Sequence, residues 1–187
     1  MDMDADAQGG VLAQLQREVA ALRAEAEARR LLGRYMFLCD TPLPEGEMTA
    51  EARAAAIGDL FTEDAVWEGV GGAHGAQFGR HIGPAGIAAH MTRFYAARDP
   101  RQVFNTHYVC SEQVWATEDG AEGNWVQFQP WIHDDGASIL RSSRLHVSFR
   151  PTGSGWKIAR YRTENLFIAD LPDNWTKSLI AQSVLMA

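Results

Sequence analysis

Two side chains in this sequence, Asp40 and His107, have the types and positions that acid–base chemistry requires. Asp40 ends an apolar helical run at a proline-rich break, where an acid is badly placed for the helix dipole. His107 stands among β-forming residues, and we expect it in the middle of a strand over Val103–Ala116. An imidazole whose second nitrogen donates to a carboxylate can act as a general base near neutral pH. The alternatives are a hydrogen-bonded core or outer-face histidine, and an acid turned outward into the loop.

Other residue types that carry chemistry form no recognisable site. The spacing of His74, His81 and His90 matches no compact metal motif, and the sequence has no His-x-x-x-His or Cys-x-x-Cys. Two cysteines are too few for a disulfide scaffold. The glycine-rich stretch 69–79 is expected to be a loop or hairpin tip, and it lacks the Gly-Lys-Ser/Thr ending of a phosphate-binding loop. The sequence therefore predicts chemistry without a metal or cofactor.

Composition is that of one globular domain. The chain has 187 residues, of which 46% are hydrophobic and 22% charged. A formal net charge of -7 and the lack of a basic stripe argue against a nucleic-acid partner. The acidic N-terminus lacks the features of a signal peptide, and no apolar stretch approaches membrane-spanning length. We expect a cytoplasmic protein that acts on neither nucleic acid nor membrane.

The first half of the chain reads as helical. Residues 1–10 are small and acidic and are expected to be disordered, followed by one domain over 11–187. Residues 11–38 read as one long helix with a short apolar seam at three- and four-residue steps. The seam comprises Leu12, Leu15, Val19, Leu22 and Ala26. It is too short to hold a coiled coil alone, so we expect it to pack on its own domain or on a partner subunit, in a dimer or trimer.

The rest of the chain changes from helices to strands. Further helices are predicted over 50–60 and from Gly83 to about Asp99, with a short strand at 65–68 between them. Four long β-patterned runs follow, joined by short glycine-bearing connections: Val103–Ala116, Ala121–Ile132, Ser138–Phe149 and Trp156–Ile168. A short helix is expected near Asn174. This order predicts an α+β fold in which a bent antiparallel sheet wraps around the N-terminal helices and leaves a cavity.

Several short motifs, in this order and spacing, resemble the SnoaL-like family. They are Arg34–Asp40, Leu60–Trp67, Gly83–Ile87 and Gly155–Arg162, and the likeness spans residues 31–168. The resemblance implies a cone of bent antiparallel sheet with three helices, also called nuclear-transport-factor-like or cystatin-like. Within the family, the sequence is most similar to bile-acid dehydratases, scytalone dehydratase and hexachlorocyclohexane dehydrochlorinase. The segment 41–57 is longer than in most relatives, so the resemblance does not define the pocket entrance or the substrate.

The resemblance also assigns site residues. Those enzymes use an Asp near the end of the first helix and a His after the third helix, which correspond to Asp40 and His107. A tyrosine before the Asp corresponds to Tyr35, and an arginine on the final strand to Arg162, with Arg160 as the alternative. The implied chemistry is removal of a proton from carbon by His107, with Asp40 orienting the ring and stabilising the imidazolium.

The substrate implied by the resemblance is a small hydrophobic ring compound. Three aromatic residues on the sheet-forming segments are expected to line its pocket, although core or interface packing is the alternative for each: Trp67, Trp125 and Phe128. Elimination of water or another leaving group is the expected reaction. A non-catalytic assembly module like the β subunit of ring-hydroxylating dioxygenases, and an isomerase or cyclase using the same pocket, remain the rival functions.

Overall fold

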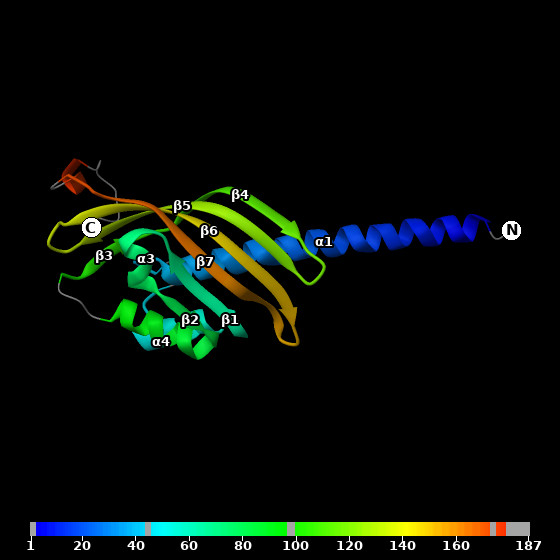
Figure 1. The fold of residues 1–187 in the computed structure, drawn as a ribbon, viewed down its shortest axis with the longest axis horizontal. Coiled ribbons are helices and arrows are strands. Elements are labelled where there is room, and N and C mark those ends of the chain that lie inside the picture. Colours follow the sequence, from blue (N-terminus) through cyan, green and yellow to red (C-terminus); the bar gives the residue numbers. More distant parts are fainter. Residues whose placement is uncertain (1–2, 44–45, 97–99, 173–174, 179–187) are drawn as a thin grey trace.

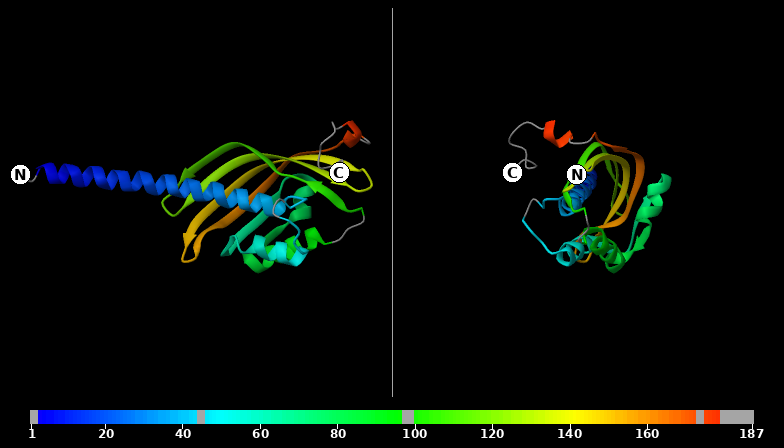
Figure 2. Two further views of the ribbon diagram at one scale, coloured as in Figure 1. Left: turned by 180° about the vertical axis from the view of Figure 1, so that it is seen from behind. Right: turned by 90° about the vertical axis from the view of Figure 1, so that its left-hand side faces the viewer.

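The computed structural model describes residues 3–43, 46–96, 100–172 and 175–178. Its helices and strands follow in the order α1 (Met3–Cys39), α2 (Ala50–Gly58), β1 (Phe61–Val70), α3 (Gly72–Phe78), β2 (Arg80–Ile82), α4 (Gly83–Tyr95), β3 (Gln102–Asn105), β4 (Tyr108–Ala116), β5 (Ala121–His133), β6 (Ser138–Thr152), β7 (Gly155–Asp170) and the 3-10 turn η1 (Trp175–Ser178). The architecture is α+β, as predicted, with a strongly curled sheet around the C-terminal part of α1 (Figures 1 and 2).

The sheet has seven strands in the order β2-β1-β7-β6-β5-β3, and β4 also pairs with β5. All described pairings are antiparallel except β1 with β7, which is parallel, so the sheet is mixed rather than wholly antiparallel as expected. Helices α2 and α4 pack on each other below one end of the curl (Figure 2). Together these elements form a half-barrel cone that is closed on one side by helices.

Helix α1 has two parts with different surroundings. Its C-terminal part buries Ala24, Ala28, Leu32 and Met36, a four-residue spacing that places one stripe against the concave face of the sheet. Its N-terminal part projects beyond the sheet (Figure 1). The helix begins at Met3, so residues 3–10, which we expected to be disordered, continue it.

The predicted strand over Val103–Ala116 is interrupted at Thr106 and His107, so His107 lies between β3 and β4 and not within a strand. Asn105 pairs with Trp131 and Tyr108 with Phe128, which are in the same register. That register would place Pro130 opposite Thr106. Because proline has no backbone N–H, the ladder is weakened at this point. The backbone N–H and C=O of Asn105 bond to Thr41, on the side away from β5, and the backbone N–H of His107 donates to Asp40 next to it.

Other differences from the predicted elements are local. The glycine-rich stretch 69–79 contains the short helix α3, and the strand expected at 65–68 extends over all of β1. Only η1 is described near the predicted C-terminal helix, and residues 179–187 lie outside the described part of the chain. Among the described helices, none is long and apolar enough to cross a membrane.

Candidate active site

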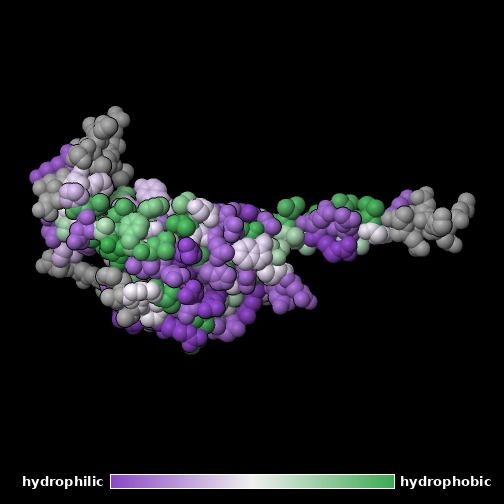
Figure 3. Space-filling model, turned by 45° about the horizontal axis from the view of Figure 1, so that its top comes forward, coloured by the Kyte–Doolittle hydropathy of each residue, from purple (hydrophilic) through white to green (hydrophobic). Residues whose placement is uncertain are grey.

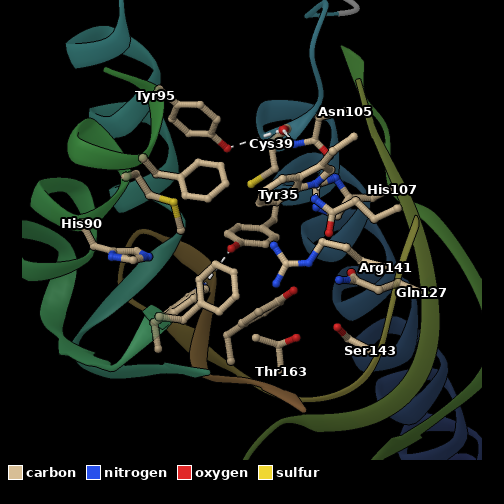
Figure 4. A pocket seen from close by; sticks show the side chains of 17 residues that line it. Tyr35, Cys39, His90, Tyr95, Asn105, His107, Gln127, Arg141, Ser143 and Thr163 are labelled. Carbon is tan, nitrogen blue, oxygen red and sulfur yellow. Dashed lines mark hydrogen bonds between the residues drawn. The ribbon is translucent and has the colours of Figure 1, made fainter. Parts of the chain in front are cut away.

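A cavity lies between the concave face of the sheet, the C-terminal end of α1 and helix α4. Figure 4 shows side chains from all of these elements converging on it. Its lining comprises aromatic and sulfur-containing side chains and a group of polar side chains from β5, β6 and β7. An apolar wall with a few placed polar groups is the typical composition of a small-molecule site.

Asp40 and His107 meet at this cavity. Asp40 Oδ1 lies 2.8 Å from His107 Nδ1 and also accepts a hydrogen bond of 2.9 Å from the His107 backbone N–H. Both side chains are more than nine-tenths buried. Because a carboxylate only accepts, the neutral imidazole carries its proton on Nδ1 and leaves the lone pair on Nε2. The sequence thus placed these two residues together correctly, although the strand position of His107 was wrong.

Short backbone bonds hold the pair in place. Thr41 and Asn105 form an isolated antiparallel bridge, with N–O distances of 2.7 and 2.9 Å. Arg53 of α2 donates to the backbone carbonyls of Leu38 and Asp40, which are among the unpaired carbonyls at the end of α1. The segment 41–57 therefore supplies the cation that fixes the end of this helix.

Tyr35 lies one and a half turns before Asp40 and lines the same cavity. Its hydroxyl accepts a hydrogen bond of 2.8 Å from Trp67 Nε1, which leaves its own proton available for another acceptor. Burial raises the pKa of Tyr35 well above its usual value, so the phenol stays protonated at neutral pH. Trp67, one of the three predicted substrate-binding aromatics, also lines the cavity.

Arg162 and its alternative Arg160 do not line the cavity, which corrects the prediction. Both point to the outer face of β7, where Arg160 pairs with Glu68 and Arg162 lies 3.6 Å from Glu164. The register of β7 against β6 shifts between Ile158 and Arg160, as in a β-bulge. A shift of one residue turns every following side chain to the opposite face. Tyr161 and Thr163 therefore line the cavity instead.

Two predicted substrate-binding aromatics also lie elsewhere. Trp125 is buried between the sheet and α1, and its Nε1 donates to Glu112 at 3.1 Å. Phe128 is 40% exposed and packs edge to face on Phe167, on the outer side of the sheet. Neither residue lines the cavity described above: Phe128 is at an outward-facing position of β5, and Trp125 lies further along the strand, where it lines a neighbouring pocket with His107.

Sequence reasoning missed the polar side of the cavity. Arg141 and Ser143 on β6 lie opposite Gln129 and Gln127 on β5, and all four line the cavity. A signal was present in β6, because Leu145, Val147 and Phe149 alternate as buried residues, and the same phase extended backwards includes 143 and 141. Polar residues in phase with a buried apolar row indicate a lined cavity rather than solvent.

A second histidine, His90 of α4, also reaches the cavity. Its ring stacks on His81 with 4.1 Å between centroids and lies 4.8 Å from the Trp67 ring. Burial, assisted by the charges of His81 and Arg93, lowers the pKa of His90 to about 4, so it is neutral at physiological pH. Within the described residues, no group of three or more His, Cys, Asp or Glu side chains could hold a metal ion.

These features define a class, an α+β cone with a buried Asp–His pair in its cavity. The sequence matches the SnoaL-like domain family over residues 20–162, and the chain belongs to that family. Among curated proteins, none matches the sequence significantly.

Solved structures share the fold. A protein of Novosphingobium aromaticivorans DSM provisionally described as an aromatic ring hydroxylase is 23% identical, with a TM-score of 0.62 over 82% of this chain and 96% of that one. Hexachlorocyclohexane dehydrochlorinase LinA-type3 from Novosphingobium barchaimii LL02 is 16% identical, with a TM-score of 0.59 over 81% and 92%. An NTF2-like protein with a cystatin-like fold from Novosphingobium aromaticivorans DSM is 23% identical, with a TM-score of 0.54 over 83% and 88%. At these identities the likeness concerns the fold.

Proposed function

We propose that this protein is a cofactor-independent lyase that eliminates water, or another leaving group, from a small ring compound. The single observation that carries the proposal is the buried contact of 2.8 Å between Asp40 and His107 at the cavity. That contact sets the Nδ1–H tautomer and makes Nε2 the base. A dehydrochlorinase among the structural neighbours is consistent with this chemistry.

The reaction proceeds with a balanced transfer of protons. His107 Nε2 takes a proton from a substrate carbon, and the C–H electron pair forms the new double bond. The bond to the neighbouring hydroxyl breaks, and Tyr35 supplies the proton that lets it leave as water. Asp40 stabilises the imidazolium that forms, as a carboxylate does beside other catalytic histidines. The protonated imidazolium then returns the proton to Tyr35 through solvent or product.

The proposal is tested with a panel of ring compounds that carry a hydroxyl or halide next to an acidic C–H, starting with hexachlorocyclohexane. Mass spectrometry of the products separates the reaction classes, because elimination yields a product lighter by water or hydrogen halide and isomerisation leaves the mass unchanged. The wild type should form the alkene and His107→Ala should not. His146→Ala, whose histidine bonds to Asn124 away from the cavity, is the matched control and should keep wild-type turnover.

An assembly role without catalysis predicts that no compound in the panel is converted. A product of unchanged mass that depends on His107 identifies an isomerase or cyclase instead. Either result would replace the elimination reaction proposed here.

A further inference from the structure

Arg141 is a buried cation to which the described residues offer no hydrogen-bond acceptor. Its side chain is 4% exposed, and its guanidinium stacks over the rings of Trp131 and Phe78 at 4.3 and 4.8 Å. Among the described residues, no carboxylate or carbonyl accepts a hydrogen bond from it. Desolvation lowers the pKa of Arg141 to about 10, which leaves it charged at neutral pH. A buried charge with its donors unused is costly unless a ligand completes it.

The guanidinium points into the cavity, on the same side as His107, Gln127 and Ser143 (Figure 4). Arg141 is the only cavity-lining residue with a permanent charge in the described part of the chain. The described buried residues with a formal charge are Asp40, Arg53 and Arg141, which together carry one excess positive charge. This balance favours a ligand with one negative charge.

Two further buried atoms of the same lining lack partners among the described residues. They are the side-chain oxygen of Gln127 and Nε1 of Trp131. Buried polar atoms are nearly always hydrogen-bonded, so unfilled ones that line a cavity indicate where a ligand binds. A ligand hydroxyl can donate to Gln127, and a ligand oxygen can accept from Trp131.

We propose that Arg141 binds a carboxylate on the substrate, so that the substrate class is a ring carboxylic acid with its reacting C–H directed toward His107. This proposal rests on the lyase function proposed above and adds the chemical class of its substrate. The planar guanidinium suits a carboxylate because it can donate two parallel hydrogen bonds. The aromatic wall formed by Trp67, Phe78 and Phe94 would then receive the ring.

The test uses two probes of equal shape, 1-naphthoate and 1-naphthamide, measured by isothermal titration calorimetry at pH 8. The wild type should bind naphthoate about tenfold to a hundredfold more tightly, the range for a hydrogen bond to a charged group in a buried site. Arg141→Met should abolish the preference. Arg141→Lys, which keeps the charge but not the planar fork, should retain part of it. Arg162→Met removes an outer-face arginine and should bind like the wild type.

Equal binding of the two probes, binding of neither, or a preference that survives in Arg141→Met would overturn the proposal. His107→Ala should keep the preference for naphthoate, because the carboxylate site does not depend on the base. Binding of naphthoate through Arg141 without turnover of any ring compound would therefore refute only the lyase function. Turnover of uncharged rings without a preference for naphthoate would refute only the carboxylate site.

A second inference concerns the projecting part of α1. Five apolar side chains there are at least half exposed, at Val11, Leu12, Leu15, Val19 and Leu22. Figure 3 shows hydrophobic and hydrophilic residues on different sides of the projecting helix. In a heptad assignment with Leu12 and Val19 at a and with Leu15 and Leu22 at d, this seam faces away from Ala24 and Ala28, which pack on the domain.

The charges beside the seam specify its partner. Glu18 and Glu25 occupy g positions, and Arg23 and Arg30 occupy the e positions five residues later. In a parallel pair of identical helices these residues meet as Glu–Arg pairs across the interface. In an antiparallel pair, g would face g and e would face e, so like charges would meet. We infer that the projecting helix forms a parallel two-stranded coiled coil with a second copy of this chain.

Sedimentation equilibrium of the full chain tests this dimer. Because the seam covers little more than two heptads, the wild type should dimerise in a concentration-dependent manner. Leu15→Glu with Leu22→Glu should be monomeric, whereas Ala20→Glu, at an exposed position outside the seam, should dimerise like the wild type. In a Cys110→Ser background, Leu22→Cys should form an intermolecular disulfide, because like residues meet only in the parallel arrangement. A monomeric wild type, a dimeric double variant or failure of this cross-link would contradict the inference.

Discussion

Two buried arginines in this protein have similar burial and different surroundings. Arg53 is 7% exposed and stacks on Tyr95 at 3.7 Å, and Arg141 is 4% exposed and stacks on Trp131. Arg53 donates to two backbone carbonyls at the end of α1, whereas Arg141 has no acceptor among the described residues. The first group is satisfied within the protein and fixes Asp40. The second is unsatisfied and indicates where a ligand binds.

The largest expected effect on stability comes from replacing Arg53, which donates hydrogen bonds to the end of α1. Arg53→Met removes the charge-assisted hydrogen bonds to the carbonyls of Leu38 and Asp40 and a longer one of 3.4 Å to the Thr41 hydroxyl. We expect the free energy of unfolding to fall by about 2–4 kcal/mol. Urea unfolding followed by circular dichroism measures the change. A loss below about 1 kcal/mol would show that the end of α1 does not depend on Arg53.

Asn105→Ala removes a hydrogen bond between β3 and the same end of α1. Asn105 is 1% exposed, donates to the Cys39 carbonyl at 3.1 Å and accepts from Gln129 at 2.7 Å. Its loss leaves Gln129 Nε2 without this acceptor and the Cys39 carbonyl with only the longer bond of 3.5 Å from Tyr95, which we expect to cost about 1.5–3 kcal/mol in the same unfolding measurement. Asn124→Ala, a half-buried position on β5, serves as the control and should cost less. Equal losses in the two variants would contradict a special role for Asn105.

A smaller change in the free energy of unfolding should come from the protonation of His90 as the pH falls. His90 is neutral in the folded protein above pH of about 4, whereas an unfolded histidine binds a proton below roughly pH 6.5. The unfolded state therefore binds more protons in this window, and the free energy of unfolding falls as the pH decreases from about 6.5 to about 4. Between pH 7 and pH 5 the contribution should be roughly 1–2 kcal/mol, allowing for solvent screening. His90→Gln should lose that much less stability than the wild type over this interval, and identical losses would refute the assignment.

The smallest expected change in stability comes from replacing Arg141. Arg141→Met replaces a buried cation, which has no acceptor in the part of the chain that the structure describes, by an apolar side chain of similar length. We expect the melting temperature to stay the same or rise, corresponding to a gain of up to about 1 kcal/mol. Differential scanning calorimetry without ligand measures it. A marked destabilisation would place Arg141 with Arg53 as a structural residue and remove the contrast between the two regions.

Much of the fold and half of the proposed site could be predicted from the sequence. The helix seam, the hairpin connections and the proline break after Asp40 are local signals, so the α+β order and the position of Asp40 followed from them. The pairing of Asp40 with His107 joins residues 67 positions apart. It came from the resemblance to the SnoaL-like family and not from any local pattern.

The errors arose where the pairing between strands overrides the local pattern. Strand alternation continued from Ile158 places Arg160 and Arg162 inside, and the register shift at this point turns them outward. The interruption at His107 depends on Pro130 in the partner strand, which no inspection of residues 103–116 reveals. The inward position of Arg141 follows from the alternation of buried residues along β6. The resemblance instead implied a site arginine on the final strand.

The central claim is that Asp40 and His107 act as one unit in proton removal. On a substrate identified by the panel, kcat/KM should be measured for the wild type, Asp40→Asn, His107→Ala and the double variant. Each single change should lower kcat/KM by about 10²–10⁴, and the double variant should be no slower than His107→Ala, because Asp40 acts only through the imidazole. Full activity in either single variant, or losses that multiply in the double variant, would contradict the account.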